Sequence, residues 1–211
     1  MLIRREHIDN EGLLGIWKMD ESCEELIQLL PEYMRSDAIE HIKEIRSERR
    51  TIEWLSTRIL LFRLLNEEKT ILNNPDGKPY LEEGTHHISI SHTKDYAAIY
   101  LQENHLVGID IEIRSDRVSK VAHKFIGENE YIDPSQKIVH LLLHWSAKES
   151  MFKLMEENEI HFKHHLHIHP FIPAAKGIFT AMETRTRRNR SFTIDYEVHP
   201  DYVLTWVQDS P

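Results

Sequence analysis

The chain has 211 residues, of which 40% are hydrophobic, and a formal net charge of −9 at pH 7, so it has room for one domain or two small ones. The acidic balance disfavours nucleic acid and anionic membranes as partners, and no apolar run approaches the ~20 residues that span a bilayer. Cys23 is the only cysteine and no signal peptide is recognisable, which excludes an internal disulfide and predicts a cytoplasmic location.

The first half of the chain predicts helices followed by strands. Ser22 and Glu25 have the spacing of a capping box, which marks a helix start. The expected elements are a strand over 15–19, helices over 22–30, 36–45 and 48–66, a turn-rich loop over 73–79, and strands over 87–92, 97–101 and 105–113. The last three strands have short connections, which predict a single antiparallel meander.

The second half repeats this plan loosely. Its expected elements are a short helix over 118–125, a long helix over 135–157, and strands near 160–168, 177–182, 191–198 and 202–207. Helices followed by strands, twice over, predict an α+β fold of two similar lobes in a pseudo-twofold arrangement, each a small antiparallel sheet packed on a long helix. We place the lobes at 1–104 and 105–211 and expect an active site at their interface.

An acidic strand over 107–113 is the first candidate for chemistry. Apolar residues occupy every second position, so Asp110 and Glu112 lie on one face. Two carboxylates this close repel each other unless a cation lies between them, and Mg²⁺ prefers oxygen ligands and leaves room for phosphates. The simpler interpretation is a half-exposed strand with two solvated acids.

The long helix of the second half offers two further charged groups. Glu149 precedes Lys153 by four residues, a spacing that by itself describes a surface ion pair worth a few tenths of a kcal/mol. Beside the acidic strand, a second interpretation is that Glu149 supplies a third metal ligand or a base. Lys153 is then a phosphate-binding cation next to the same metal.

Four motifs in order carry a family resemblance. They are Gly77-Lys78-Pro79, Ile90-Ser91-His92, the acidic strand Gly108-Ile109-Asp110-Ile111-Glu112, and Trp145-x-x-Lys148-Glu149-x-x-x-Lys153. Together they resemble the signature of the 4′-phosphopantetheinyl transferases. A full-length half precedes the acidic strand, which resembles the two-lobed Sfp type, a monomer that acts as a pseudo-dimer, and not the half-length carrier-protein synthases that assemble as trimers.

The resemblance implies a reaction and a set of residues. The phosphopantetheine arm of coenzyme A passes to a serine of an apo acyl- or peptidyl-carrier protein, as in fatty-acid synthesis, and adenosine 3′,5′-bisphosphate is released. The implied catalytic residues are Asp110, Glu149 and Lys153, with Glu149 taking the serine proton directly or through a water, and the implied ligands of Mg²⁺ or Mn²⁺ are Asp110, Glu112 and Glu149. The implied coenzyme A contacts are Lys78, Pro79, Ser91, His92, Lys153 and Arg50, with Arg58 as an alternative to Arg50.

Two other classes of function remain open on the sequence. A metal-dependent nuclease also uses acids and a lysine, but it usually carries Glu-x-Lys on one strand, whereas Ile113 and Arg114 follow Glu112 here. A non-catalytic nucleotide-binding module would need the lysine and Ser-His features without the three acids. Transfer of a phosphopantetheine mass to a carrier protein separates the three.

Overall fold

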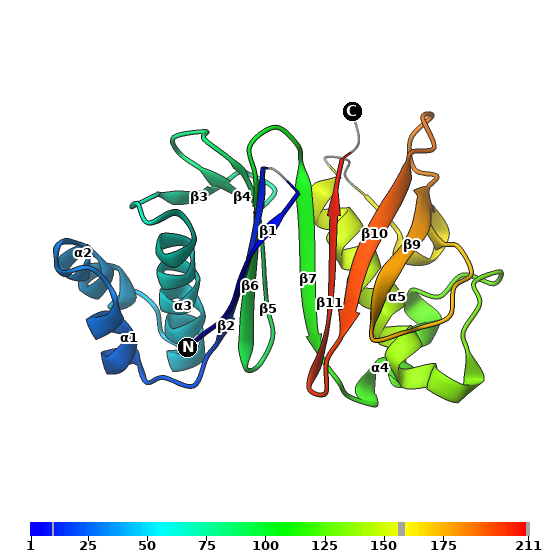
Figure 1. Cartoon of the computed structure of the whole chain (residues 1–211), viewed down its shortest axis with the longest axis horizontal. Coiled ribbons are helices and arrows are strands. Elements are labelled where there is room, and N and C mark those ends of the chain that lie inside the picture. The colour runs from blue at the N-terminus through cyan, green and yellow to red at the C-terminus, as the bar shows by residue number, and fades with distance from the viewer. Residues whose placement is uncertain (10, 156–158, 210–211) are drawn as a thin grey trace.

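Two antiparallel sheets face each other at the centre of the molecule, with helices on the outer side of each (Figure 1). The computed structural model describes residues 1–9, 11–155 and 159–209. The α+β prediction of two lobes, each a sheet packed on a long helix, is confirmed.

The first lobe contains a four-stranded sheet in the order β1-β2-β6-β5 and a small β3-β4 hairpin. Its elements are β1 Leu2–Ile8, β2 Gly12–Lys18, α1 Cys23–Leu29, α2 Glu32–Ile42, α3 Glu48–Leu65, β3 Ile71–Asn73, β4 Pro79–Leu81, β5 His87–His92 and β6 Tyr96–Gln102. The predicted capping box is present at α1, where Ser22 and Glu25 bond each other's backbone N–H. Leu55, Ile59 and Leu60 of α3 pack in the core beneath this sheet.

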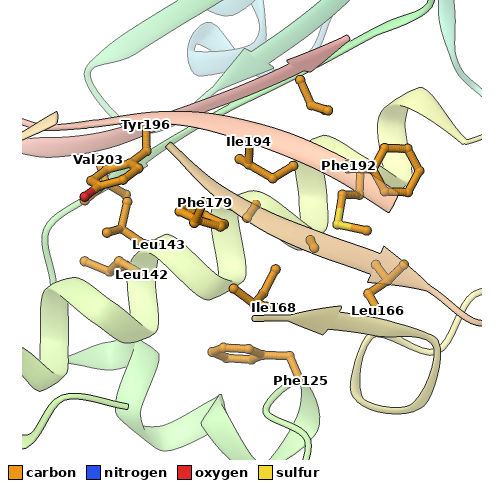
Figure 2. Packing of buried hydrophobic residues seen from close by; sticks show 14 of the residues in the cluster. Phe125, Leu142, Leu143, Leu166, Ile168, Phe179, Phe192, Ile194, Tyr196 and Val203 are labelled. Carbon is orange, nitrogen blue, oxygen red and sulfur yellow. The ribbon is translucent and has the colours of Figure 1, made fainter. Parts of the chain in front are cut away.

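The second lobe contains a five-stranded sheet in the order β7-β11-β10-β9-β8. Its elements are β7 Val107–Ile113, α4 Arg117–Val121, the 3-10 turns Ala122–Lys124 and Pro134–Gln136, α5 Lys137–Leu154, α6 Phe162–His165, β8 Leu166–Ile168, β9 Lys176–Glu183, β10 Ser191–Val198 and β11 Tyr202–Gln208. Side chains of α5, β9, β10 and β11 form its core, as Figure 2 shows around Leu143, Phe179 and Ile194. The predicted helix end at Glu157 lies outside the described residues.

The two sheets share a third apolar layer between the lobes. Ile109 and Ile111 of β7 face Leu14, Ile16 and Tyr100 of the first sheet in this layer. Because side chains alternate along a strand, the acids of β7 point the opposite way, toward α5. The period-two pattern therefore gives β7 two different faces: the apolar face joins the lobes, and the other face carries the charged groups.

The predicted three-strand meander is wrong at its last strand. β5 and β6 pair as expected, but β7 pairs with β11 of the second sheet. The short connection between β6 and β7 crosses from one sheet to the facing sheet instead of forming a hairpin. Burial of β7 on both faces stabilises this crossing, since Val107 through Ile111 are all buried.

Other differences arise where local patterns are weak. β1 was not expected, because it is a charged edge strand with no alternation of apolar residues. The strand predicted over 160–168 is wrong for most of its length: Phe162–His165 forms α6, and only Leu166–Ile168 pairs with β9. Phe162 packs against the rings of Trp145 and Phe152 on α5, and this tertiary contact favours a helical turn over the predicted strand. No helix within the described ranges is long and apolar enough to cross a membrane.

Candidate active site

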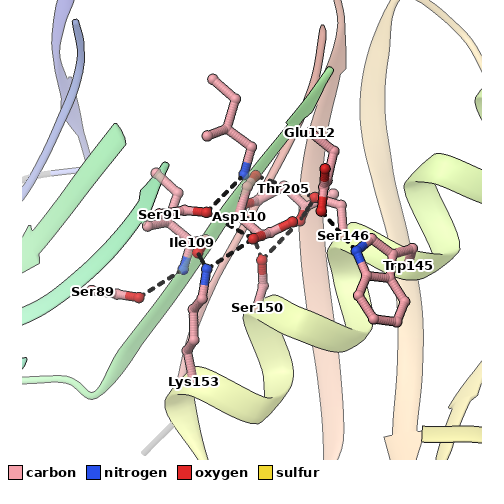
Figure 3. A network of polar contacts seen from close by, with 11 residues as sticks. Ser89, Ser91, Ile109, Asp110, Glu112, Trp145, Ser146, Ser150, Lys153 and Thr205 are labelled. Atoms are coloured by element: carbon pink, nitrogen blue, oxygen red, sulfur yellow. Dashed lines mark hydrogen bonds and ion pairs between the residues drawn. The ribbon is translucent and has the colours of Figure 1, made fainter. Parts of the chain in front are cut away.

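Asp110 is the centre of a polar network between the lobes (Figure 3). The residue is buried, at 4% exposure. Oδ1 accepts hydrogen bonds from Lys153 Nζ at 2.8 Å and from Ser91 Oγ at 2.8 Å, and Lys153 also donates to the backbone oxygen of Ile109 at 2.9 Å. Oδ2 is buried without any hydrogen-bond partner among the described residues. A buried carboxylate oxygen with free lone pairs is costly unless something binds it.

Two serines of β5 hold β7 in place beside the first sheet. Ser89 Oγ accepts the N–H of Ile109 at 3.0 Å, and Ser91 Oγ accepts the N–H of Ile111 at 3.4 Å. Side-chain hydroxyls thus replace the backbone ladder between the edge strands of the two sheets. Ser91, which was predicted to contact coenzyme A, is buried beside Asp110 and orients its carboxylate; the contact with coenzyme A stays a prediction.

Glu112 and Glu149 complete a group of three carboxylates around Lys153. Trp145 Nε1 donates to Glu112 Oε1 at 2.7 Å, whereas no described residue donates a hydrogen bond to Glu149. Burial, and next the negative charge of Asp110, raise the pKa of both Glu112 and Glu149 to about 7. The three acids therefore repel one another at neutral pH, and a cation relieves that repulsion.

The donor set suits a hard divalent cation. Carboxylate oxygens are what Mg²⁺ and Mn²⁺ prefer, and the unpartnered Asp110 Oδ2 provides an open coordination position. The carboxylates do not converge on one point, because no three His, Cys, Asp or Glu within 1–9, 11–155 and 159–209 are grouped closely enough to hold a metal ion. Lys153 instead supplies the positive charge beside Asp110.

The raised pKa of Glu112 predicts a pH-dependent stability. A carboxyl whose pKa rises on folding stabilises the protein below its unfolded pKa, and this contribution is lost as the pH rises through about 7. Glu112→Gln is therefore expected to stabilise the metal-free protein by roughly 1–2 kcal/mol at pH 8, and by much less at pH 5.5. Urea unfolding in EDTA at both pH values measures this, with the exposed Glu128→Gln as control. An equal difference at the two pH values would contradict the assignment.

Lys78 reaches across the gap between the lobes. It follows Gly77, whose φ of +83° suits glycine, and its N–H is fixed by Asn74 Oδ1 at 2.8 Å. Its ammonium donates to the backbone oxygens of Phe152, at 3.2 Å, and of Met155. Cations are favoured at a helix C-terminus, so Lys78 links the β3-β4 turn to the end of α5. It also lines a cavity of about 530 Å³ together with Lys153.

A second cavity, of about 630 Å³, has a basic wall. Arg50, Arg58, His92 and Pro79 line it, together with the buried Glu53. Arg50 donates to Glu53 at 3.1 Å, and His92 Nδ1 lies 3.5 Å from the same carboxylate. Burial is the main cause that lowers the pKa of His92, and the neighbouring cations add to it. Pro79 lines this cavity and the one at Lys78, so the two cavities adjoin.

Arg58 is the most enclosed cation of this wall. Its guanidinium lies 4.4 Å above the ring of Trp54 and donates to Thr57 Oγ1 at 3.1 Å, and no described carboxylate forms an ion pair with it. Burial lowers its pKa to about 10, so it still carries a proton at neutral pH. A stacked guanidinium with unused donors is suited to binding a phosphate.

Several residues around the site have roles that the sequence did not reveal. Lys148 is fully buried, and its ammonium bonds Glu130 Oε2 at 2.7 Å and the backbone oxygen of Phe125 at 2.6 Å. Ser89 and Trp145 hold β7 and Glu112, respectively. Trp145 and Lys148 both belong to the motif around Glu149, but only Trp145, four residues before Glu149, lies one helical turn away on the same side of α5.

Comparison with known proteins identifies the half of the chain that carries the acids. Residues 106–207 match the sequence model of the 4′-phosphopantetheinyl transferase superfamily. The second lobe is a 4′-phosphopantetheinyl transferase superfamily domain. A stretch of 100 residues is 33% identical to the 4′-phosphopantetheinyl transferase gsp of Aneurinibacillus migulanus, and it covers 45% of this chain and 41% of that protein. The matched phosphopantetheinyl transferase segment contains Asp110, Glu112, Glu149 and Lys153.

Proposed function

We propose that the protein transfers the 4′-phosphopantetheine group of coenzyme A to a serine of an apo acyl- or peptidyl-carrier protein and releases adenosine 3′,5′-bisphosphate. The observation that carries this proposal is the meeting of Asp110, Glu112, Glu149 and Lys153 within the segment that matches the family. The lobes would extend over 1–104 and 105–211, and the change of sheet between β6 and β7 supports that division.

Three residues would hold a divalent cation, Mg²⁺ or Mn²⁺: Asp110, Glu112 and Glu149, whose side chains would have to turn toward one another from their present positions to share it. The unpartnered oxygen of Asp110 and the raised pKa of the two glutamates support this choice. When bound, the metal supplies positive charge to the pyrophosphate of coenzyme A, which is what phosphoryl transfer mainly requires.

The protein's own groups would then move the proton and balance the charge. Glu149 accepts the proton of the attacking serine hydroxyl, since it is the acid of the group that accepts no hydrogen bond from any described residue. Lys153, now 2.8 Å from Asp110, donates to a phosphate oxygen as negative charge shifts toward the leaving group. Both side chains come from one face of α5, so a single helix positions the base and the cation.

The basic wall of the second cavity would bind the nucleotide. Arg50, Arg58 and His92 face the coenzyme A phosphates, while Pro79 lies beside the adenine. The cluster of cations around this space in an otherwise acidic protein supports the assignment. We also infer that the protein acts as a monomer in the cytoplasm, since each lobe supplies one side of the site and Cys23 is the only cysteine.

One assay tests the proposal directly. The protein is incubated with coenzyme A, Mg²⁺ and apo carrier proteins of the fatty-acid and peptide-synthetase types, and each carrier is weighed as an intact protein. We expect a gain of one phosphopantetheine mass that EDTA prevents. Coenzyme A binding without any mass gain would favour a nucleotide-binding module. Cleavage of DNA with no mass gain would favour a nuclease.

Arg58→Ala is expected to weaken coenzyme A binding. Loss of a hydrogen bond to a charged group costs about 1.5–3 kcal/mol, which corresponds to roughly a 10- to 100-fold higher Kd. Calorimetric titration with coenzyme A measures the change, and Arg63→Ala on the exposed side of α3 is the matched control. Equal affinity of the two variants would place the nucleotide elsewhere.

A further inference from the structure

Thr205 lies opposite Asp110 on the neighbouring strand. The two residues are partners in the antiparallel ladder between β11 and β7, and cross-strand partners present their side chains on the same face of a sheet. Thr205 therefore points toward α5, as Asp110 does. It is fully buried, at 0% exposure, and lies beyond the motifs that identify the site in the sequence.

The Thr205 hydroxyl connects two serines of α5 (Figure 3). Its Oγ1 lies 2.9 Å from Ser146 Oγ and 2.8 Å from Ser150 Oγ. Ser150 Oγ also donates to the backbone oxygen of Thr205 at 3.1 Å, and Ser146 Oγ donates to that of Asp110 at 3.2 Å. Both serines are fully buried. The helix is thus hydrogen-bonded to β11 and β7 at two points one turn apart.

Thr205 is the residue of this network whose hydroxyl contacts both serine hydroxyls. Three hydroxyls carry three protons for four contacts. When both serines donate to backbone oxygens, the single Thr205 proton serves one of its two contacts with the serine hydroxyls at a time. Without Thr205 Oγ1, Ser146 and Ser150 keep their carbonyl partners but lose the atom that couples them.

Directional contacts matter here because the helix lies unusually close to the sheet. A Cβ at Gly108 would lie 1.9 Å from the backbone oxygen of Ser150, so only glycine permits this approach. Small residues at such a contact leave few interlocking side chains, and apolar packing is non-directional. Hydrogen bonds between hydroxyls fix the height and rotation of α5. Glu149 and Lys153 lie on the same helix, within a turn of Ser150.

We propose that Thr205 is a positioning residue of the active site. Its hydroxyl fixes α5 against β7 and β11, so that Glu149 and Lys153 meet Asp110 and Glu112. Thr205 itself touches no substrate in this role. The expected loss of kcat rests on the proposed function. The expected change in the Lys153–Asp110 contact rests on the structure alone.

Thr205→Val removes the hydroxyl and keeps the shape, and Thr205→Ser keeps the hydroxyl. Because small misplacements of catalytic groups cost up to ~100-fold, we expect Thr205→Val to lower kcat of transfer by roughly 10- to 100-fold. KM for coenzyme A should stay nearly unchanged, since the basic cavity belongs to the first lobe. Thr205→Ser should restore most of kcat. Thr193→Val, the same change at an exposed position of β10, is the matched control and should have no effect.

Three results would overturn the proposal. The first is an unchanged kcat in Thr205→Val, and the second is a folded Thr205→Ser that remains as slow as Thr205→Val. If Thr205→Val does not fold, the Ser146→Ala/Ser150→Ala double variant takes its place, and a full kcat there overturns the proposal. The third result is structural and can be obtained even if the wild-type protein transfers nothing. It is a crystal structure of Thr205→Val, or of the double variant in its place, in which Lys153 Nζ still lies 2.8 Å from Asp110 Oδ1 as in the wild type.

Discussion

Glutamine at position 149 is expected to abolish phosphopantetheine transfer while leaving the protein folded. Glu149 is the one acid of the group that accepts no hydrogen bond from any described residue, which leaves its carboxylate available to take the serine proton. Loss of a general base alone costs on the order of 10²- to 10⁴-fold in rate, and Glu149→Gln also removes a charge that would hold the metal. Single-turnover transfer to an apo carrier protein, followed by mass spectrometry, measures the loss.

Three controls separate chemistry from folding and from substrate binding. The melting temperature of Glu149→Gln without metal should equal or exceed that of the wild type at pH 8, because an acid with a raised pKa is a destabilising charge at that pH. Coenzyme A binding should be retained, since the basic cavity is lined from the first lobe. Glu128→Gln, an exposed glutamate of the same lobe, should transfer normally. Retained turnover in Glu149→Gln would refute its role as the base.

The largest loss of stability is expected from Lys148→Met. Burial is the main cause that lowers the pKa of Lys148, and the charge of Glu130 opposes it, so the ammonium depends on its partner. Methionine leaves Glu130 charged and buried, with its hydrogen bonds to the N–H groups of Gly127 and Ile168 but without a cation. Breaking a buried ion pair on one side costs about 3–5 kcal/mol. Urea unfolding of the purified variant measures the loss.

A surface lysine and a double variant test that interpretation. Lys137→Met at the exposed start of α5 should change the free energy of unfolding by less than about 0.5 kcal/mol. Lys148→Met/Glu130→Gln should be less destabilised than Lys148→Met, because the unpaired charge is gone. If the double variant is the weaker of the two, the ion pair is not the source of the loss.

The sequence was most informative where local chemistry decides local structure. The capping box of α1, the long helix α3 and the period-two strand β7 follow from side chains within a few residues of one another. The acids of β7 and the pair Glu149 and Lys153 were placed on faces correctly, and the fold brings those faces together. Short-range periodicity therefore predicted which of these side chains share a face.

These local patterns did not predict which residues far apart in the sequence come into contact. The assignment of β7 to the second sheet depends on burial on both of its faces, and the short connection before it is equally compatible with a hairpin. The contact of Ser91 with Asp110 could not be predicted for the same reason: a strand pattern fixes the face of a side chain but not what lies across from it. Thr205 and Lys148 gain their roles only from partners 55 and 18 residues away, which periodicity cannot reveal.

The apolar layer shared by the two sheets is expected to make the protein unfold as one cooperative unit despite its two-lobed plan. Ile109, Ile111, Leu204 and Trp206 of the second lobe are buried only because the first lobe covers them. A fragment that begins at the connection between β6 and β7 would expose this face to solvent as a continuous apolar surface. The second lobe produced alone would therefore self-associate or aggregate, and the intact chain would unfold in a single transition.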